Sequence, residues 1–187
     1  GNDTAISFFA NGDGVLTIFG GATIGFTEME SLDLNNFGSV QVSGATGNNE
    51  FVIRSAGVAD DFVVTVDGTN FNVEATSFLF TGFAQDDTLT IDNAAGLVNR
   101  DIEFQGSTGS DTLVIEGNPG SAVARETYLV GATQDAGIWI LDANGSAGVG
   151  ASGPFDGDEL VVTFTGLDPV DTSTPAVNFD IFLTGGV

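Results

Sequence analysis

The chain has 187 residues, which is long enough for one domain with a buried core, and its 42% hydrophobic content argues against a disordered chain. Its 26 acidic residues against 3 basic ones give a formal net charge of −23, so nucleic acids and anionic membrane surfaces should repel it, and cations are its natural small partners. The absence of cysteine and histidine excludes disulfides, zinc–thiolate sites and Ser-His-Asp or Cys-His catalysis. No run of about 18 apolar residues occurs, so no membrane insertion is predicted.

Short segments with the composition of β-strands follow one another along the whole chain, and helix signals are nearly absent. Each segment is rich in Val, Ile, Phe or Thr and is bounded by Gly, Asn or Asp, as strands are. The pattern therefore predicts an all-β domain. The predicted strands are 5–9, 15–19, 31–34, 39–42, 51–54, 62–66, 77–80, 88–91, 101–104, 112–115, 127–130, 137–141, 160–164 and 178–183.

The predicted strands are also spaced as a repeat, because Asp87, Asp111 and Asp135 recur every 24 residues. A period near 24 residues is typical of one rung of a parallel β-solenoid, in which like positions stack into ladders about 4.8 Å apart. We therefore predict a parallel β-solenoid, with an antiparallel β-sandwich of similar turn spacing as the alternative. Polar turns that begin with a strand-ending glycine start at Gly44, Gly82 and Gly106.

Two stretches interrupt this repeat. Residues 142–159 are rich in small, flexible residues that cannot form a rung, so they predict a loop inserted between strands and projecting outward. Residues 167–175 contain two prolines and read as a fixed connector to the last strand. With these exceptions, residues 1–187 are expected to form a single solenoid module.

The two ends of the sequence together rebuild a motif that lies intact inside it. Residues 185–187 (G-G-V) followed by residues 1–4 (G-N-D-T) give G-x-x-G-x-D-T, which also occurs at residues 106–112. Such a unit is suited to repeat end to end, within a longer polypeptide or between separate subunits, through pairing of strand 178–183 with strand 5–9 of the next unit. The residues of this predicted subunit junction are Gly1, Asn2, Asp3, Thr4, Ile6, Phe179, Ile181, Leu183, Gly185, Gly186 and Val187.

Three phrases of the sequence resemble a known kind of repeat. They are F-T-G-L-D-P-V-D-T at residues 164–172, L-T-G-G at residues 183–186 and G-N-D-T at residues 1–4. They resemble the "TGLEPV" and "LTGGxGNDT" phrases of tandem β-helical, hemolysin-like modules in giant bacterial cell-surface and secreted proteins. The resemblance covers the whole chain loosely and only these phrases specifically. It implies a role in adhesion, matrix or cell-envelope architecture. The strongly acidic, lysine-free composition separately predicts an extracellular location.

Calcium is the predicted cofactor. Stacked carboxylates repel one another unless a hard cation with oxygen ligands lies between them. The alternative is that each side chain caps its own turn through an Asx hydrogen bond and binds no metal. The predicted ligands are Asp3, Asn49, Asp87, Asp111 and Asp135.

These observations predict a structural protein and not an enzyme. A hydrolase or lyase that acts on acidic sugars needs cationic groups, and only Arg54, Arg100 and Arg125 are present, each of which is expected to form a local salt bridge. The predicted function is an extracellular module that stacks head-to-tail on copies of itself into a filament or stalk of a bacterial surface or matrix, with divalent cations as further partners. The alternative is a calcium-dependent adhesive module of a giant surface protein, whose inserted loop contacts a ligand.

Overall fold

The computed structural model describes residues 3–8, 14–18, 23–26, 31–58, 61–133, 135–145, 157–168 and 170–183. Every regular element in these residues is a β-strand, so the all-β prediction is confirmed, and no helix that could span a membrane occurs among them. The strands are β1 (Asp3–Phe8), β2 (Gly14–Ile18), β3 (Thr23–Phe26), β4 (Ser31–Ser43), β5 (Glu50–Ser55), β6 (Asp61–Val66), β7 (Thr69–Thr81), β8 (Thr88–Asp92), β9 (Asp101–Gln105), β10 (Thr112–Glu116), β11 (Val123–Val130), β12 (Gly137–Asp142), β13 (Glu159–Thr165), β14 (Val170–Thr172) and β15 (Ala176–Leu183).

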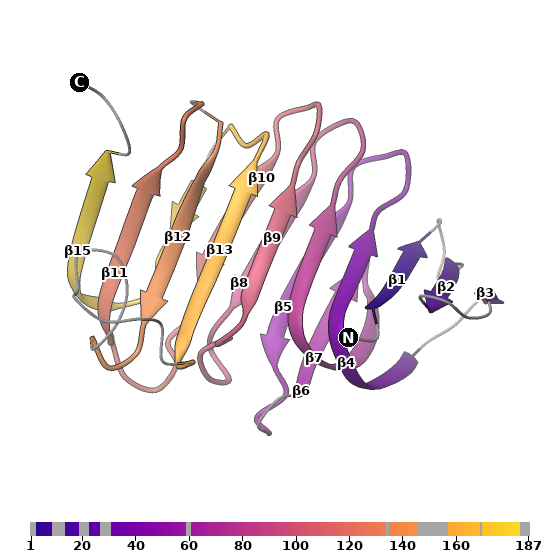
Figure 1. Cartoon of the computed structure of the whole chain (residues 1–187), viewed down its shortest axis with the longest axis horizontal. Coiled ribbons are helices and arrows are strands. Elements are labelled where there is room, and N and C mark those ends of the chain that lie inside the picture. Colours follow the sequence, from indigo (N-terminus) through magenta and orange to yellow (C-terminus); the bar gives the residue numbers. More distant parts are fainter. Residues whose placement is uncertain are drawn as a thin grey trace.

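The strands form one mixed sheet that curls back on itself into two facing layers (Figure 1). The front layer contains the parallel strands β4, β7, β9 and β13, followed by β12 and β11 in antiparallel pairing and by β15, which is parallel to β11. The back layer is the parallel ladder β5, β8, β10 and β14. β6 pairs antiparallel with both β5 and β7 and so joins the two layers.

A recurring unit links the layers: a front strand, a turn that begins with glycine, and a back strand. We call this unit a rung. The described strands form it four times, as β4–Gly44–β5, β7–Gly82–β8, β9–Gly106–β10 and β13–Gly166–β14. The rungs are hydrogen-bonded through their glycines, because the Gly44, Gly82 and Gly106 N–H groups donate to the carbonyl oxygens of residues 81, 105 and 165 at 3.1, 2.9 and 3.0 Å.

The parallel β-solenoid with 24-residue rungs is not confirmed, because the sheet is mixed. The 24-residue step occurs between β8 and β10, where Thr88 pairs with Thr112. The preceding back strands are further apart along the chain, since Glu50 pairs with Thr88, and β6 is inserted between them. The hairpin formed by β11 and β12 likewise separates β10 from the next rung. The antiparallel sandwich alternative also fails as a description, since both ladders of rungs are parallel.

Two long strands make the curl. β4 and β7 have 13 residues each and pair with one another along their lengths, with a register shift between Leu34 and Phe37. That irregularity explains why the sequence predicted two short strands, 31–34 and 39–42, where one strand exists. The first half of β7 pairs with β6 and its second half with β9, so the bend in β7 carries the sheet from one layer into the other.

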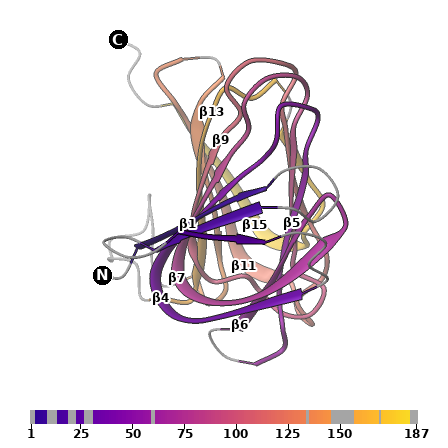
Figure 2. The same ribbon diagram turned by 90° about the vertical axis from the view of Figure 1, so that its right-hand side faces the viewer.

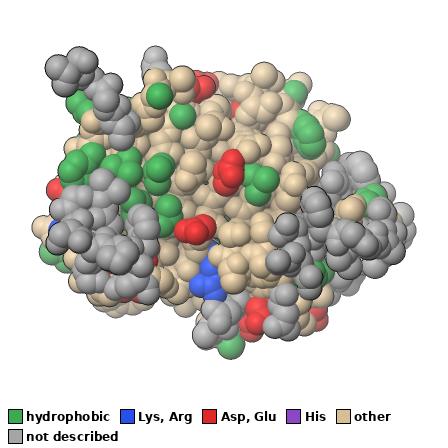
Figure 3. Space-filling model, viewed as in Figure 1, with side chains coloured by type: hydrophobic (Ala, Val, Ile, Leu, Met, Phe, Trp, Pro, Cys, Tyr) green, Lys and Arg blue, Asp and Glu red, His purple; other side chains and the backbone are tan. Residues whose placement is uncertain are grey.

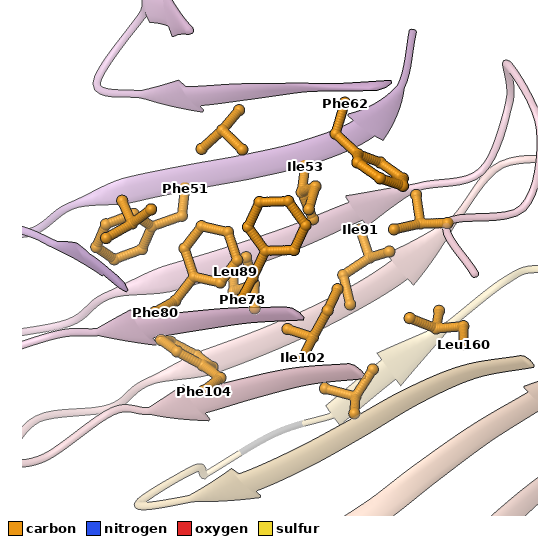
Figure 4. Packing of buried hydrophobic residues seen from close by; sticks show 14 of the residues in the cluster. Phe51, Ile53, Phe62, Phe78, Phe80, Leu89, Ile91, Ile102, Phe104 and Leu160 are labelled. Atoms are coloured by element: carbon orange, nitrogen blue, oxygen red, sulfur yellow. The ribbon is translucent and has the colours of Figure 1, made fainter. Parts of the chain in front are cut away.

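The core lies between the layers and follows from the alternation of side chains along each strand. In β6 and β8 every second residue is buried. Phenylalanine rings from both layers meet there: the centroid of Phe51 lies 5.7 Å from that of Phe80 and 6.4 Å from that of Phe104, in the tilted and edge-on arrangements that aromatic pairs favour (Figure 4).

The two ends of this two-layered molecule differ. β1, β2 and β3 form an antiparallel group joined to β4 through β1. Seen from that end in Figure 2, these indigo strands run across the molecule from the front layer towards the back layer. At the opposite end, the front layer finishes with β15 and the back layer with β14, and we call this the open end.

Candidate functional site

Three six-residue turns with the pattern G-x-x-x-x-[Asn/Asp] stack along one long edge of the molecule, at the top of Figure 1. They are residues 44–49, 82–87 and 106–111, and we call them the turn stack. Each connects the front strand of a rung to its back strand. Because adjacent strands in each ladder are parallel and in register, equivalent residues of the three turns lie next to one another.

The last residues of these turns, Asn49, Asp87 and Asp111, form a buried hydrogen-bonded ladder. The Asn49 N–H and side-chain Nδ2 donate to Asp87 Oδ1 at 2.8 and 2.7 Å, and the Asp87 N–H donates to Asp111 Oδ1 at 2.8 Å. Backbone bonds from Thr88 and Thr112 to the carbonyl oxygens of Asn49 and Asp87 run beside them at 2.9 and 2.8 Å. Each carboxylate therefore satisfies a donor of the neighbouring turn, and hydrogen bonds of this charge-assisted kind are stronger than neutral ones.

The ladder also explains the glycine five residues before each of these side chains. A Cβ on Gly82 would overlap Asp87 Oδ2, and a Cβ on Gly106 would lie 2.6 Å from Asp111 Oδ2 and 2.5 Å from the Gly166 carbonyl oxygen. The carboxylate folds back over the glycine, so no larger residue fits there. The spacing noticed in the sequence is thus a packing requirement of the turn.

One oxygen of each ladder carboxylate is left without a donor among the described residues. Asp87 and Asp111 are 0% exposed, and their Oδ2 atoms accept no hydrogen bond from the described residues. Burial raises the pKa of Asp111 above its ordinary value of 3.8, and the hydrogen bond from the Asp87 N–H partly opposes this shift. The negative charges of Asp87, Asp86 and Asp168 raise the pKa of Asp111 further. The protonated form of Asp111 is therefore favoured by folding.

This shift predicts a pH dependence of stability. Since the pKa of Asp111 is raised in the folded state, its stabilising contribution is complete below about pH 3.8 and is lost as the pH rises through the folded pKa. We expect Asp111→Asn to raise the Tm at pH 7 and to reduce the gain in Tm that the wild type shows on acidification to pH 4. An amide fits this ladder, because Asn49 already occupies it.

The control for that prediction is Asp135→Asn, which removes one negative charge at an exposed position. Thermal unfolding of the wild type and both variants between pH 4 and pH 8 separates the local effect from the relief of general charge repulsion. An Asp111→Asn variant with the same pH dependence as the wild type would contradict the assignment.

The structure does not place Asp135 in the ladder. Its side chain is exposed, and its carbonyl oxygen accepts the N–H of Leu167 at 3.1 Å. The backbone position next to Asp111 belongs instead to Asp168, whose N–H donates to the Asp111 carbonyl oxygen at 3.0 Å. The prediction that Asp135 continues the 24-residue ladder is therefore wrong, because the β11–β12 hairpin intervenes before the chain returns to the back layer.

Asp3, another predicted calcium ligand, lies on β1 opposite a residue of β4 that is five positions before the first turn of the stack. It pairs with Ser39, where the pairing of β1 with β4 begins, whereas the turn begins at Gly44, beyond the end of β4. The five predicted ligands thus do not form one site. Within the described residues, no group of three or more acidic side chains is arranged to hold a metal ion. Calcium binding by this protein stays a prediction.

A second row of hydrogen bonds between turn residues runs beside this ladder. The Asp86 N–H donates to Asn48 Oδ1 at 3.3 Å, and the Ser110 N–H donates to Asp86 Oδ1 at 2.9 Å. These residues directly precede Asn49, Asp87 and Asp111, so the signal was a second polar residue at the same place in each turn. The stack is held by two parallel rows of side-chain hydrogen bonds.

The open end carries the other candidate site, a row of exposed apolar side chains on β15. β15 pairs with β11 alone, and β14 pairs with β10 alone, so each has a free edge in the described structure. Along β15, Val177 is 70% exposed, Phe179 50%, Ile181 57% and Leu183 80%. Figure 3 views the outer face of the front layer, which is the face opposite to the core, and shows that hydrophobic side chains gather at the left-hand end of this face as well.

These exposed side chains lie on the face of the sheet that elsewhere forms the core. Directly opposed residues point to the same side of a sheet, and Ile181 pairs with Tyr128, which pairs with Trp139, which pairs with the buried Val162. The Trp139 ring stacks on Tyr128 at 4.8 Å and contacts Phe179 at 5.9 Å between centroids. The apolar face of the front layer therefore continues past the last strand of the back layer and is left uncovered at β15.

The predicted subunit junction is only partly available. Its residues Phe179, Ile181 and Leu183 lie on β15, but β1, which carries Asp3, Thr4 and Ile6, is hydrogen-bonded to β2 on one side and β4 on the other. β1 therefore has no free edge with which β15 of another copy could pair, and that part of the prediction is wrong. The remaining predicted junction residues, 1–2 and 185–187, lie outside the described residues.

The predicted loop 142–159 is bounded by the hairpin of β12 and β13, in which Asp142 pairs with Glu159. Its residues 146–156 lie outside the described residues. Arg125, on the neighbouring strand β11, forms the predicted local ion pair with Asp180 of β15 at 3.6 Å. Arg100 is engaged locally too: its guanidinium lies 4.8 Å from the centroid of the Phe62 ring, and its Nε donates to the Ala75 carbonyl oxygen at 2.9 Å.

The turn stack is held together by hydrogen bonds between its turns, whereas the open end exposes a strand edge that no described strand pairs with and a row of apolar side chains. Comparison of the chain with protein-family models, with curated proteins and with solved structures found no match.

Proposed function

We propose that the chain is a structural module that associates end to end, through its open end, into a filament or stalk outside the cell. The observation that carries this proposal is the edge strand β15. Natural edge strands are usually short or protected by lysine, proline or a bulge, because a free strand edge pairs with other chains. β15 has eight residues, contains neither lysine nor proline, and exposes four apolar side chains.

The charge distribution supports association at this place. The net charge of −23 repels copies of the chain from one another at most surfaces. β15 contributes a single carboxylate, Asp180, which is paired with Arg125. Its edge is therefore a part of the surface where two copies can approach with little repulsion, while the acidic remainder keeps finished filaments apart and makes their bundling sensitive to divalent cations.

The partner edge in a head-to-tail assembly is β3 of the next copy. Within the described strands, β3 pairs with β2 alone and lies at the end opposite to β15 (Figure 1). A contact between opposite ends of identical copies joins two different surfaces, and it propagates into a filament when its rotation does not close a ring. In this proposal the parallel ladders of successive copies continue as a solenoid-like column. The extracellular location rests on the acidic, lysine-free and cysteine-free composition.

The test is a charge placed on the free edge. We expect wild-type protein to form uniform filaments in negative-stain electron microscopy and Ile181→Asp to remain monomeric in sedimentation experiments, because the new carboxylate would be buried at the junction. The matched control is Val58→Asp, at a residue that is 62% exposed in the connection between β5 and β6. This variant should assemble as the wild type does.

Other outcomes would count against the proposal. Discrete dimers would indicate two-fold pairing of β15 with β15 and would contradict the head-to-tail arrangement. Monodisperse wild-type monomers at all concentrations would favour the alternative, an adhesive module carried in one long polypeptide.

A further inference from the structure

The pairing of neighbouring strands carries a direction across the front layer. β15 is parallel to β11, β11 is antiparallel to β12, and β12 is antiparallel to β13, so β15 runs in the direction of β13. Parallel pairings lead from β13 through β9, β7 and β4 to β1, and two antiparallel pairings lead from β1 through β2 to β3. β3 and β15 therefore run in the same direction, although they lie at opposite ends of the sheet (Figure 1).

The same pairings carry the two faces of the sheet. On β15, Ile181 belongs to the core face, so the alternate residues 178, 180 and 182 belong to the outer face. On β3, Gly25 is connected by direct pairing through β2 and β1 to Ser43 of β4. Ser43 directly follows the buried core residue Val42, so the position of Gly25 also belongs to the outer face.

The direction, the face and the free edge of a strand are not independent of one another. β3 and β15 belong to one sheet, run in the same direction and turn the same face outward, so their free edges are opposite edges of that sheet. A copy that is moved along the long axis without being turned over therefore brings the free edge of its β3 against the free edge of β15.

An antiparallel junction would have a different consequence for the faces. The same two edges could meet in that direction only if β3 were turned over, and its outer face would then lie beside Phe179 and Ile181, which are 50% and 57% exposed. Because burial of apolar surface drives association, the favoured arrangement is the one in which the core face of β15 is continued by the core face of the next copy.

We infer that β3 of the next copy pairs parallel to β15 and continues both faces of the front layer, so that Gly25 lies on the outer face beside residue 178, 180 or 182. This inference rests on the proposed end-to-end association and adds the direction and the face of the partner strand. The junction then repeats the parallel pairing that joins β4, β7, β9 and β13 inside each copy. All copies in the filament face the same way.

Engineered disulfides test this arrangement without background, because the chain contains no cysteine. Cα atoms joined by a disulfide are usually about 4.4–6.8 Å apart, and paired residues of adjacent strands lie within that range. Gly25→Cys is sterically possible, since a Cβ on Gly25 meets nothing within 4 Å. It is combined with a cysteine at one outer-face position of β15 in three double variants, with Asn178→Cys, Asp180→Cys or Phe182→Cys.

The matched controls combine Gly25→Cys with a cysteine at a core-face position of β15, as Phe179→Cys, Ile181→Cys or Leu183→Cys. We expect oxidised filaments of at least one outer-face variant to give a ladder of covalent oligomers in non-reducing gel electrophoresis, whereas the core-face variants stay largely monomeric. Thr23→Cys, at a position on the same face of β3, repeats the test independently and should cross-link two residues earlier in β15 than Gly25→Cys does.

The outcomes distinguish this inference from the proposed function. Ladders confined to the core-face variants would overturn the inference, because β3 would then be turned over, and they would leave the end-to-end association standing. Filaments that no variant cross-links would also overturn it, since β3 would not be the partner of β15. Wild-type protein that forms no filaments would overturn the inference together with the proposed function.

Discussion

Gly109→Ala is expected to destabilise the protein by roughly 3 kcal/mol, from strain in a backbone region that only glycine adopts readily together with overpacking. Gly109 has a φ of +145°, and a Cβ there would overlap the carbonyl group of Gln85 in the neighbouring turn. Because the obstruction is backbone and not a flexible side chain, relief requires the two turns to separate. That movement breaks the rows of hydrogen bonds that join them.

The chain supplies its own control, since Gly47 occupies the equivalent position in the first turn of the stack. A Cβ on Gly47 meets nothing within 4 Å, so Gly47→Ala should change the free energy of unfolding by less than about 1 kcal/mol. Urea unfolding of the two variants measures the difference. Equal losses in both would mean that the second and third turns are not stacked as described.

Phe104→Ala is expected to cost about 3–5 kcal/mol, the usual range for removing a buried phenylalanine ring. Phe104 is fully buried on β9 and meets Phe51 of the back layer across the core (Figure 4). The cavity would open where the two layers pack, and the parallel ladders on either side cannot collapse into it without breaking register. Chemical denaturation followed by the fluorescence of Trp139 measures the loss.

Phe83→Ala is the matched control, because Phe83 is half exposed in the second turn of the stack. Its replacement should change stability by no more than about 0.5 kcal/mol. A similar small loss for Phe104→Ala would show that the two layers are not held together by this core.

The turn stack was the most predictable part of the molecule, and its packing gives the reason. The carboxylate of Asp111 lies against Gly106, and the carboxylate of Asp87 lies against Gly82. This contact requires a glycine five residues before the aspartate in each turn, and that spacing is visible in the sequence. The fourth rung escaped notice because Asp168 follows Gly166 after two residues and not five, so its shortened turn no longer shows the pattern. Asp135 lies 24 residues after Asp111 by coincidence. The sequence analysis therefore placed Asp135 next to Asp111, where the structure has Asp168.

Strand positions were predicted better than strand pairing. Alternation in β6 and β8 is visible in the sequence, but it says nothing about whether a neighbour runs parallel or antiparallel, and the insertion of β6 and of β11 and β12 therefore could not be foreseen. The first half of β7 was missed because its outward residues, Asn70, Asn72 and Glu74, give it the composition of a turn. β14 was read as a connector because it has three residues between two prolines.

The candidate site at the open end shows a different limit. β15 has the alternation of a strand that packs on a core, and its sequence was assigned to the subunit junction. Whether its apolar face is covered depends on which strands lie beneath it, and this is a property of the sheet order. Only the structure shows that, among the described strands, the back layer ends at β14 while the front layer continues to β15.

Hydrogen exchange of β15 at increasing protein concentration tests the assembly most directly. In β15, the backbone amides that do not bond to β11 point to the free edge. We predict that these edge amides exchange rapidly in dilute solution and become protected as the concentration rises, while the amides of β8, in the interior of the back layer, stay protected throughout. Rapid exchange of the edge amides at every concentration would contradict the assignment of the open end as the surface through which copies of this chain join.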